Sequence, residues 1–152
     1  MKVVTPVADE FDDVAVGYPY LRFRDEGHDV DVAADDDVRG VDLRLEPDVD
    51  YDFEPGDYDA VLVCSDAGGS ALRGCLDSGL LFFAYGDGVR TAATAGVLED
   101  RSYAAPEVEG AGGSPTPRDV VVDAKLVTGR GDVAAFTAEC LRKLRRAALK
   151  EL

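Results

Sequence analysis

One stretch of the sequence constrains the fold more than any other: residues 80 to 98, which read LLFFAYGDGVRTAATAGVL. Its apolar start predicts a buried strand, Gly86-Asp87-Gly88 predicts a tight turn, and the small residues that follow predict a helix ending near Gly96. In α/β proteins such an elbow can hold a nucleophile above a sheet, beside a helix N-terminus. Here the tip is glycine, so the stretch predicts an architecture without supplying a nucleophile.

The composition is that of a folded chain with one domain, residues 1–152. Hydrophobic residues make up 46% of the sequence and charged residues 31%, and a chain of this length can bury a continuous core without metal or disulfide support. No apolar run approaches the roughly 18 residues of a membrane span, and the first residues lack the basic and apolar regions of a signal peptide. We therefore expect a cytoplasmic protein.

Cysteine and histidine are too few and too scattered for several kinds of site. Cys64, Cys75 and Cys140 are an odd number without metal-ligand or CxxC spacing, which predicts buried thiols rather than disulfides. His28 is the single histidine, and its place before a predicted strand favours a structural or solvated role. The sequence therefore predicts neither a metal site nor a cofactor.

The chain is strongly acidic, with 31 Asp and Glu against 16 Lys and Arg and a net charge of -15, and most of the imbalance lies in residues 1–59. Such acidity argues against nucleic acid or an anionic membrane as partner, because both require positive charge. Aspartate outnumbers glutamate and arginine outnumbers lysine, a composition we associate with proteins from salt-loving organisms, where high salt screens the repulsion. We interpret the charge as adaptation to the solvent rather than as an acidic binding surface.

The rest of the chain alternates between predicted strands and helices. Strands are expected at 2–7, 28–33, 59–64, 101–105 and, as a hairpin with an Asp-Ala turn or a nearby register, at 119–128. Helices are expected at 11–26, 69–76 and 132–150. The segment 35–58 is expected to be surface hairpin or loop, and the segment 109–117 a flexible loop. Asp9 and Glu10 should open the first helix and Pro19 should bend it. Five bases in the last 11 residues favour a solvated helix end, with a docking patch for an acidic partner as the alternative.

This alternation predicts a mostly parallel sheet with helices on both faces, in which ligands bind beyond the carboxyl ends of the strands. Three loops should meet there, at 8–13, 64–69 and 85–89. The residues expected to line that pocket are Ser65, Asp66, Tyr85, Gly86 and Gly88.

These loops, and the segments around them, resemble the ThiJ/PfpI family, whose fold is like that of class I glutamine amidotransferases. GDGVRTAATAGVLEDR is similar to the family's CHGPQLLAAAGVLKGR, and DVVVDAKLVTGRG to its VVVDGNLVTSR. DEFDDVAVGYPYLRFRDEGHDVDVAA resembles the family's opening strand, helix and second strand, and DYDAVLV its third strand. The resemblance covers nearly the whole chain. It implies a flavodoxin-like three-layer sandwich and a homo-oligomer, a dimer or larger.

The resemblance also implies which positions should carry chemistry. The family's enzymes use an elbow cysteine, an acid after the first strand and backbone amides as an oxyanion hole, and the activities reported for the family include proteolysis, glyoxalase-like and deglycase chemistry and chaperone behaviour. Carried over residue by residue, Gly86 stands at the cysteine, Asp87 at the adjacent histidine and Asp12 at the glutamate. Cys64-Ser65-Asp66 replaces the family's Pro-Gly-Gly. Because glycine has no atom that attacks a carbonyl, the covalent mechanism cannot operate from position 86.

Three side chains remain candidates for catalysis: Asp12, Asp87 and Cys64. Two close carboxylates can share a proton or a cation, and a carboxylate with a raised pKa can activate water. The structural interpretation is that Asp87 caps the following helix and Asp12 is an acid of a first turn. Cys64 ends a strand near the same pocket, but no histidine is available to activate it.

Two functions stay open on the sequence. The preferred one is a non-catalytic, homo-oligomeric member of the family that keeps its pocket for sensing a small molecule, for assembly or for a chaperone-like role. The alternative is a hydrolase or lyase for peptides or small carbonyl compounds, of peptidase, glyoxalase or deglycase type, which uses Asp12 and Asp87 with water, or Cys64. A cation-binding or assembly protein is a third possibility.

Overall fold

The computed structural model describes all 152 residues. Its main strands are β1 (Lys2–Pro6), β2 (Asp29–Ala33), β5 (Ala60–Val63), β6 (Leu81–Tyr85), β9 (Val120–Asp123) and β10 (Leu126–Gly129). Its helices are α1 (Asp13–Asp25), α2 (Gly69–Asp77), α3 (Asp87–Thr94) and α4 (Val133–Lys150), with a short 3-10 turn, Pro55–Asp57. Two small strand pairs, β3 (Val38–Arg39) with β4 (Arg44–Leu45) and β7 (Ser102–Ala104) with β8 (Ser114–Thr116), complete the chain.

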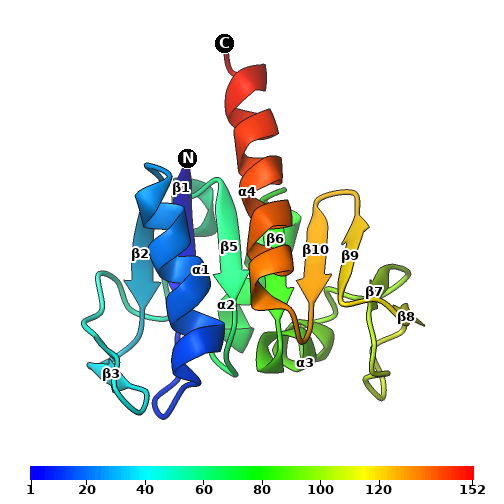
Figure 1. Ribbon diagram of the computed structural model, residues 1–152, viewed down its shortest axis with the longest axis horizontal. Helices are drawn as coiled ribbons and strands as arrows, with labels where there is room; N and C mark the ends of the chain where they lie inside the picture. Colours follow the sequence, from blue (N-terminus) through cyan, green and yellow to red (C-terminus); the bar gives the residue numbers. More distant parts are fainter.

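The central sheet has six strands in the order β2-β1-β5-β6-β10-β9. Its first five strands are parallel, and β9 runs antiparallel to β10. Helices α1 and α4 lie on one face of the sheet and α2 and α3 on the other (Figure 1). The predicted fold, a mostly parallel flavodoxin-like sheet between two helical layers, is confirmed. No helix is both long and apolar enough to cross a membrane.

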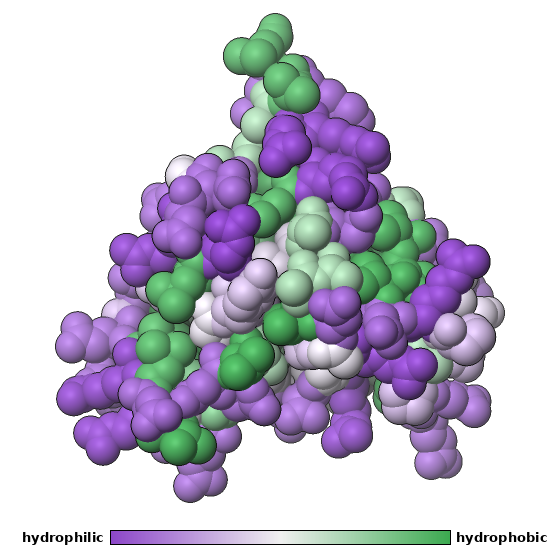
Figure 2. Space-filling view, in the orientation of Figure 1, coloured by the Kyte–Doolittle hydropathy of each residue, from purple (hydrophilic) through white to green (hydrophobic).

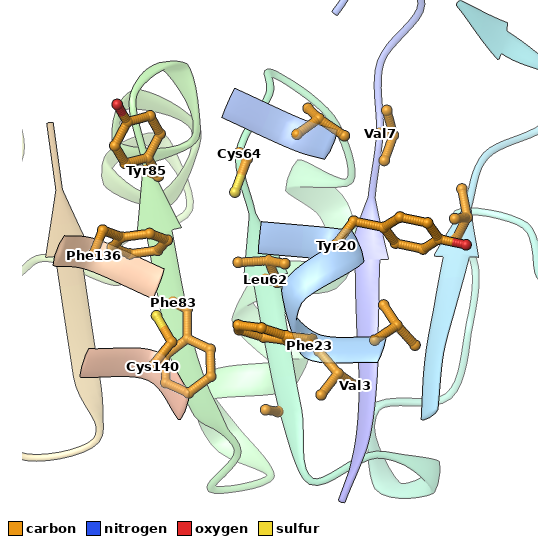
Figure 3. Packing of buried hydrophobic residues seen from close by; sticks show 14 of the residues in the cluster. Val3, Val7, Tyr20, Phe23, Leu62, Cys64, Phe83, Tyr85, Phe136 and Cys140 are labelled. Atoms are coloured by element: carbon orange, nitrogen blue, oxygen red, sulfur yellow. The ribbon is translucent and has the colours of Figure 1, made fainter. Parts of the chain in front are cut away.

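The apolar strands owe their uniform composition to burial on both sides. All four residues of β5 are buried, and so are all four of β10, because each strand faces a helical layer above and below. Under α1 and α4 the rings of Phe23 and Phe83 meet edge to face at 6.0 Å (Figure 3). Gly129 lets α4 approach β10 closely, since a Cβ there would lie 2.6 Å from the ring of Phe136.

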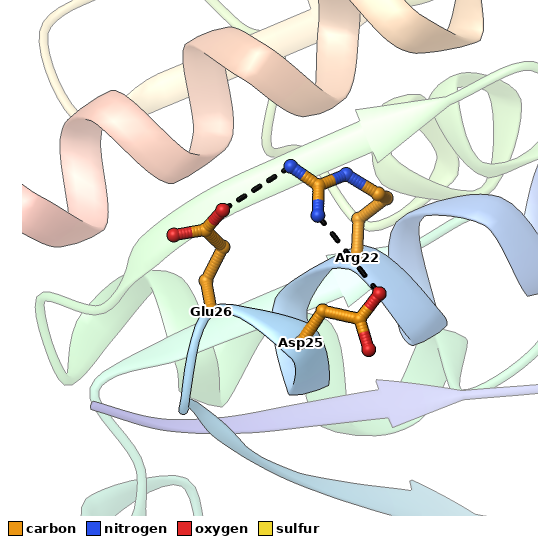
Figure 4. Close-up of polar contacts among 3 residues, drawn as sticks. All are labelled: Arg22, Asp25 and Glu26. Atoms are coloured by element: carbon orange, nitrogen blue, oxygen red, sulfur yellow. Dashed lines mark hydrogen bonds and ion pairs between the residues drawn. The ribbon is translucent and has the colours of Figure 1, made fainter.

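Helix α1 begins later than the sequence predicted, and the expected start at Asp9-Glu10 is wrong. The backbone N–H of Phe11 donates to the carbonyl of Arg39, which holds this part of the chain as a loop. Asp12 is the N-cap and the helix begins at Asp13. It then continues through Pro19 without interruption. At its other end Arg22 pairs with Asp25 at 3.9 Å and with Glu26 at 3.2 Å (Figure 4).

One expectation in the second half of the chain also needs correction. The segment 109–117, expected to be loop, contains β8, which pairs in parallel with β7; its Gly and Pro content hid a strand whose only partner is another short strand. The predicted hairpin is confirmed in the nearby register: its turn is Ala124-Lys125, because Asp123 already pairs with Leu126. Ala124 takes the positive φ of this turn, 52°.

Candidate functional site

The three predicted loops meet beyond the carboxyl ends of β1, β5 and β6 and enclose a cleft of about 480 Å³. The loop before α4 closes it from a fourth side. The lining residues are Ala8, Asp9, Glu10, Phe11, Asp12, Val14, Ala15, Cys64, Ser65, Asp66, Tyr85, Gly86, Asp87, Gly131 and Val133. The cleft lies where ligands bind in open α/β sheets, and its size is that of a small-molecule site.

The elbow keeps a backbone conformation that is rare for any residue with a side chain. Gly86 has φ 59° and ψ -124° and stands as the N-cap of α3, without a side-chain hydrogen bond. A Cβ built there would meet nothing within 4 Å, so the tip of the elbow faces open space. Glycine adopts this conformation without the steric cost that other residues carry.

Gly88 does not line the cleft but allows close packing beneath it. A Cβ at this position would lie 1.9 Å from the carbonyl oxygen of Val63. Glycine is therefore required for α3 to pack directly against the end of β5. The expectation that Gly88 belongs to the pocket is wrong, because the residue is buried beneath the pocket instead.

Hydrogen bonds between the loops hold the cleft in shape. The backbone N–H of Ala8 donates to Ser65 Oγ at 3.0 Å. Thr91 Oγ1 on α3 donates to Asp66 Oδ1 at 2.7 Å. The Tyr85 hydroxyl donates to the carbonyl of Gly131 at 2.8 Å. These bonds join the segments that follow β1 and β5, the end of β6, helix α3 and the loop before α4 around one space, so the cleft belongs to the folded architecture rather than to a single loop.

The two candidate aspartates share the cleft but differ in what they contact. Asp12 Oδ1 accepts hydrogen bonds from the backbone N–H groups of Val14, at 3.0 Å, and Ala15, at 2.9 Å, which makes it the cap of α1. Asp87 is the first residue of α3, is exposed, and its carboxylate accepts no hydrogen bond from the protein. The structural roles expected for the pair are thus exchanged: Asp12 caps its helix and Asp87 is the acid of a first turn.

Cys64 lies at the end of β5, with its side chain in the core beneath α1 (Figure 3). It is buried, as are Cys75 and Cys140. Burial raises the pKa of the Cys64 thiol well above its ordinary value, because a thiolate would lose its hydration there. His28 precedes β2, and its ring packs against Phe23, so no imidazole reaches the cleft.

The sequence did not single out every residue of the cleft. Asp9, Glu10 and Phe11 form part of its wall, because the chain stays a loop until Asp12. Glu10 has φ 59°, a left-handed conformation that is uncommon for a residue with a side chain. The sequence predicted the loop 8–13 at the cleft but singled out only Asp12 within it, because Asp9 and Glu10 were expected to open the helix.

Five acidic side chains line the cleft and no basic one does. The acids are Asp9, Glu10, Asp12, Asp66 and Asp87. Burial raises the pKa of Tyr85, and nearby negative charge, including that of Asp12, adds to the effect. The structure nonetheless brings no three His, Cys, Asp or Glu side chains together in an arrangement suited to a metal ion. The cleft favours neutral or positively charged groups over anions.

Comparison with known proteins gives one consistent family. The model of the DJ-1/PfpI family matches residues 1–143. The protein named deglycase PfpI from Pyrococcus furiosus is 29% identical over 168 residues, an alignment that covers 95% of this chain and 100% of that protein.

Solved structures of low sequence identity share the fold. A two-domain protein from Anabaena variabilis, containing DJ-1/ThiJ/PfpI-like and ferritin-like domains, superposes with a TM-score of 0.85 at 20% identity over 94% of this chain. The match spans 48% of that protein, about half its length. A ThiJ/PfpI domain protein from Brachyspira murdochii superposes with a TM-score of 0.83 at 18% identity, over 95% of this chain and 96% of the other.

Proposed function

The chain belongs to the DJ-1/PfpI family, and on that premise we propose that it is a non-catalytic member whose cleft binds a small neutral or cationic molecule. The observation that carries the proposal is the elbow. Gly86 holds a backbone with φ 59° and ψ -124° at the tip, the position where the resemblance to the family places a cysteine, and it has no side chain with which to attack a substrate.

No other side chain of the cleft replaces the missing nucleophile. Cys64 is buried with a raised pKa, which keeps it a neutral thiol at physiological pH. Ser65 accepts a hydrogen bond from Ala8, and the chain has no second histidine to activate a hydroxyl. Nucleophilic catalysis is therefore not supported at this site.

The charge of the cleft supports the class of ligand. Covalent acyl chemistry develops negative charge on an oxygen, which an enzyme stabilises with donors and positive charge. Here five carboxylates and no base surround the space, so an anion would be repelled despite the N-terminus of α3. An amine or guanidinium group would be attracted, and the half-apolar walls suit its carbon skeleton.

A second candidate function is that of a hydrolase or lyase in which an aspartate activates water. Asp12 and Asp87 line the same cleft, and the relative from Pyrococcus furiosus is named a deglycase. Against it, Asp12 Oδ1 already accepts hydrogen bonds from two backbone N–H groups as the cap of α1, so the contacts of this carboxylate are those of a structural residue.

Turnover assays separate the two functions. We expect purified wild-type protein to consume neither methylglyoxal nor glycated peptide above the buffer rate, in low and in high salt. Turnover that disappears in Asp12→Asn or in Cys64→Ala would overturn the non-catalytic proposal in favour of the second candidate.

Binding assays test the ligand class itself. Arginine amide, a small cation, is titrated into the wild type and followed by NMR shifts of the cleft residues, with the uncharged acetamide as comparison. Asp87→Asn should weaken binding several-fold, because Asp87 is exposed and has no structural hydrogen bond. Asp36→Asn removes the same charge from an exposed position outside the cleft and should leave binding unchanged. An equal effect of both variants would show that only net charge matters.

We further propose that the protein acts as a homo-oligomer. Val14, Tyr18 and Leu21 follow one face of α1 and are 60%, 36% and 51% exposed, and apolar residues interrupt the hydrophilic surface on the face drawn in Figure 2. Exposed apolar groups at this spacing are typical of an interface.

Sedimentation tests the oligomer. The wild type should give the mass of a dimer or larger, and Leu21→Asp should reduce the mass to that of a monomer. Val41→Asp, at an exposed turn, is the matched control and should leave the mass unchanged.

A further inference from the structure

A second pocket of about 440 Å³ opens at the opposite edge of the sheet, near the amino ends of the strands. It lies between the last turns of α4, the β9–β10 turn and the start of β6. Four bases line it, and one acid, Asp59, joins them; the bases are Lys125, Lys143, Arg146 and Lys150. The Asp59 carboxylate already accepts a hydrogen bond from the backbone N–H of Lys2 at 2.7 Å.

This concentration of positive charge is unusual for the chain. The sequence has four lysines, and three of them line this one pocket. None of the four bases takes part in an ion pair, whereas Arg22, Arg44, Arg73, Arg130 and Arg142 elsewhere do. In a protein with a net charge of -15, unpaired bases gathered at one place require an explanation.

The negative end of the α4 dipole explains the presence of only some of these four bases. Arg146 and Lys150 belong to the last turns of α4, where cations offset the negative end of the helix dipole. Lys125 comes from the β9–β10 turn and is far from them in sequence. The tertiary structure, and not the helix, brings it to the same pocket.

Two of the lysines are held in place by the backbone. Lys125 Nζ donates to the carbonyl of Gly79, and Lys143 Nζ donates to the carbonyl of Ala124, both at 2.8 Å. An ammonium group has three N–H donors, so each lysine keeps two for a ligand. A carbonyl positions the charge without neutralising it. Two of the four cations of the pocket are therefore held in place, and none of the four forms an ion pair.

We propose that this pocket binds a small polyanion that carries two or more linked phosphate groups. Lys143, Arg146 and Lys150 follow one face of α4 at spacings of three and four residues, and they span about 10 Å along the helix axis at 1.5 Å per residue. A single phosphate is too short to contact all three side chains, whereas linked phosphates can reach along the helix. Lysine is a common phosphate ligand.

The rest of the surface restricts the ligand to a compact one. Outside this pocket the chain is even more acidic than its net charge indicates, and a long polyanion would extend over that surface and be repelled. Below its apolar tip, α4 is covered mainly by hydrophilic residues on the face drawn in Figure 2. A nucleic acid is therefore disfavoured as the occupant.

Isothermal titration of tripolyphosphate into the full chain at low ionic strength tests the proposal. We expect saturable binding by the wild type at one site, weakened by added salt. Lys143→Ala/Arg146→Ala should weaken it about tenfold or more, since charge-assisted hydrogen bonds are lost. Lys150→Glu, at an exposed helix end, tests the same site by a change that the fold tolerates, and it should also weaken binding strongly.

Arg145→Ala is the matched control. Arg145 is exposed, belongs to the same helix and forms no ion pair, but it lines the groove between α1 and α4 instead. It removes one charge and should change the affinity less than about twofold. The proposal is overturned if wild-type protein does not bind tripolyphosphate, if Arg145→Ala weakens binding as much as Lys150→Glu does, or if duplex DNA binds more tightly than tripolyphosphate.

Discussion

The two ends of the central sheet carry opposite charge on a similar scale. The cleft at the carboxyl ends of the strands has five acids and no base, and the pocket at the amino ends has four bases and one acid. The cleft is built mainly by loops, whereas three of the four bases of the pocket lie on helix α4 and the fourth, Lys125, lies in the β9–β10 turn. A net charge of -15 therefore does not describe the local charge of either site, because the fold brings acids together at one end of the sheet and bases together at the other.

We expect the largest change in stability from a glycine substitution at the carboxyl end of the sheet, and a smaller one from a glycine substitution at the amino end. Gly88→Ala would place a Cβ 1.9 Å from the Val63 carbonyl oxygen, and because backbone cannot move aside easily we expect a loss of about 3 kcal/mol or more in the free energy of unfolding. Gly79→Ala, at the amino end, meets only Lys125 Nζ at 3.5 Å but has φ 76°, so the expected loss is about 1 kcal/mol. Urea unfolding measures both. Equal losses would contradict the close packing of α3 on β5.

The next effect concerns the pH dependence of stability and tests whether the cleft holds a reactive thiol. Burial raises the pKa of Cys64, and it raises that of Cys75 to about 12. Unfolded thiols ionise near pH 8.5, so the stabilisation is complete below that pH and is lost as pH rises toward the folded-state pKa. Each thiol should lower the free energy of unfolding by about 1.4 kcal/mol per pH unit in this window.

Urea unfolding between about pH 8.5 and pH 10 gives the slope. Cys64→Ala and Cys75→Ala should each make it shallower by the amount of one thiol. A slope that Cys64→Ala leaves unchanged would mean that Cys64 ionises in the folded state as readily as in the unfolded state. That outcome would revive it as a nucleophile of the cleft.

The smallest effect separates the two aspartates of the cleft. Asp12→Ala removes the acceptor for two backbone N–H groups of α1 and should cost about 1 kcal/mol. Asp87→Ala removes a carboxylate without a protein hydrogen bond and should cost about 0.5 kcal/mol or less. Thermal or urea unfolding measures the difference. If Asp87→Ala proves the more costly, Asp87 rather than Asp12 is the structural acid.

Much of the fold could be predicted because the relevant signals are local. The apolar runs at β5 and β10 predicted strands, and the helix expected at 132–150 is found as α4. The start of α1 could not be placed this way. Asp9 and Glu10 look like first-turn acids, and only the contact of Phe11 with Arg39 decides that they remain a loop.

Some residues of the candidate site could likewise be predicted from the sequence, and others could not. Gly86, Ser65, Asp66 and Tyr85 were expected at one pocket because carboxyl ends of neighbouring parallel strands meet, and the structure places all four around one cleft. Gly88 was misassigned, since a sequence does not reveal which glycine faces a ligand and which faces a backbone carbonyl. The sequence predicted the bases of α4 to be a solvated helix end, with a docking patch for an acidic partner as the alternative, and nothing in the sequence links Lys125 to them.

Residue type and local spacing were enough to predict the order of the elements, the mostly parallel sheet and a glycine at the tip of the elbow. Which charges lie close together follows from the tertiary fold alone. Lys125 and Lys143 share one pocket, and Asp12 and Asp87 share one cleft, although each pair is separated by many residues. Electrostatic interaction depends on distance through space, and that distance exists only once the chain is folded.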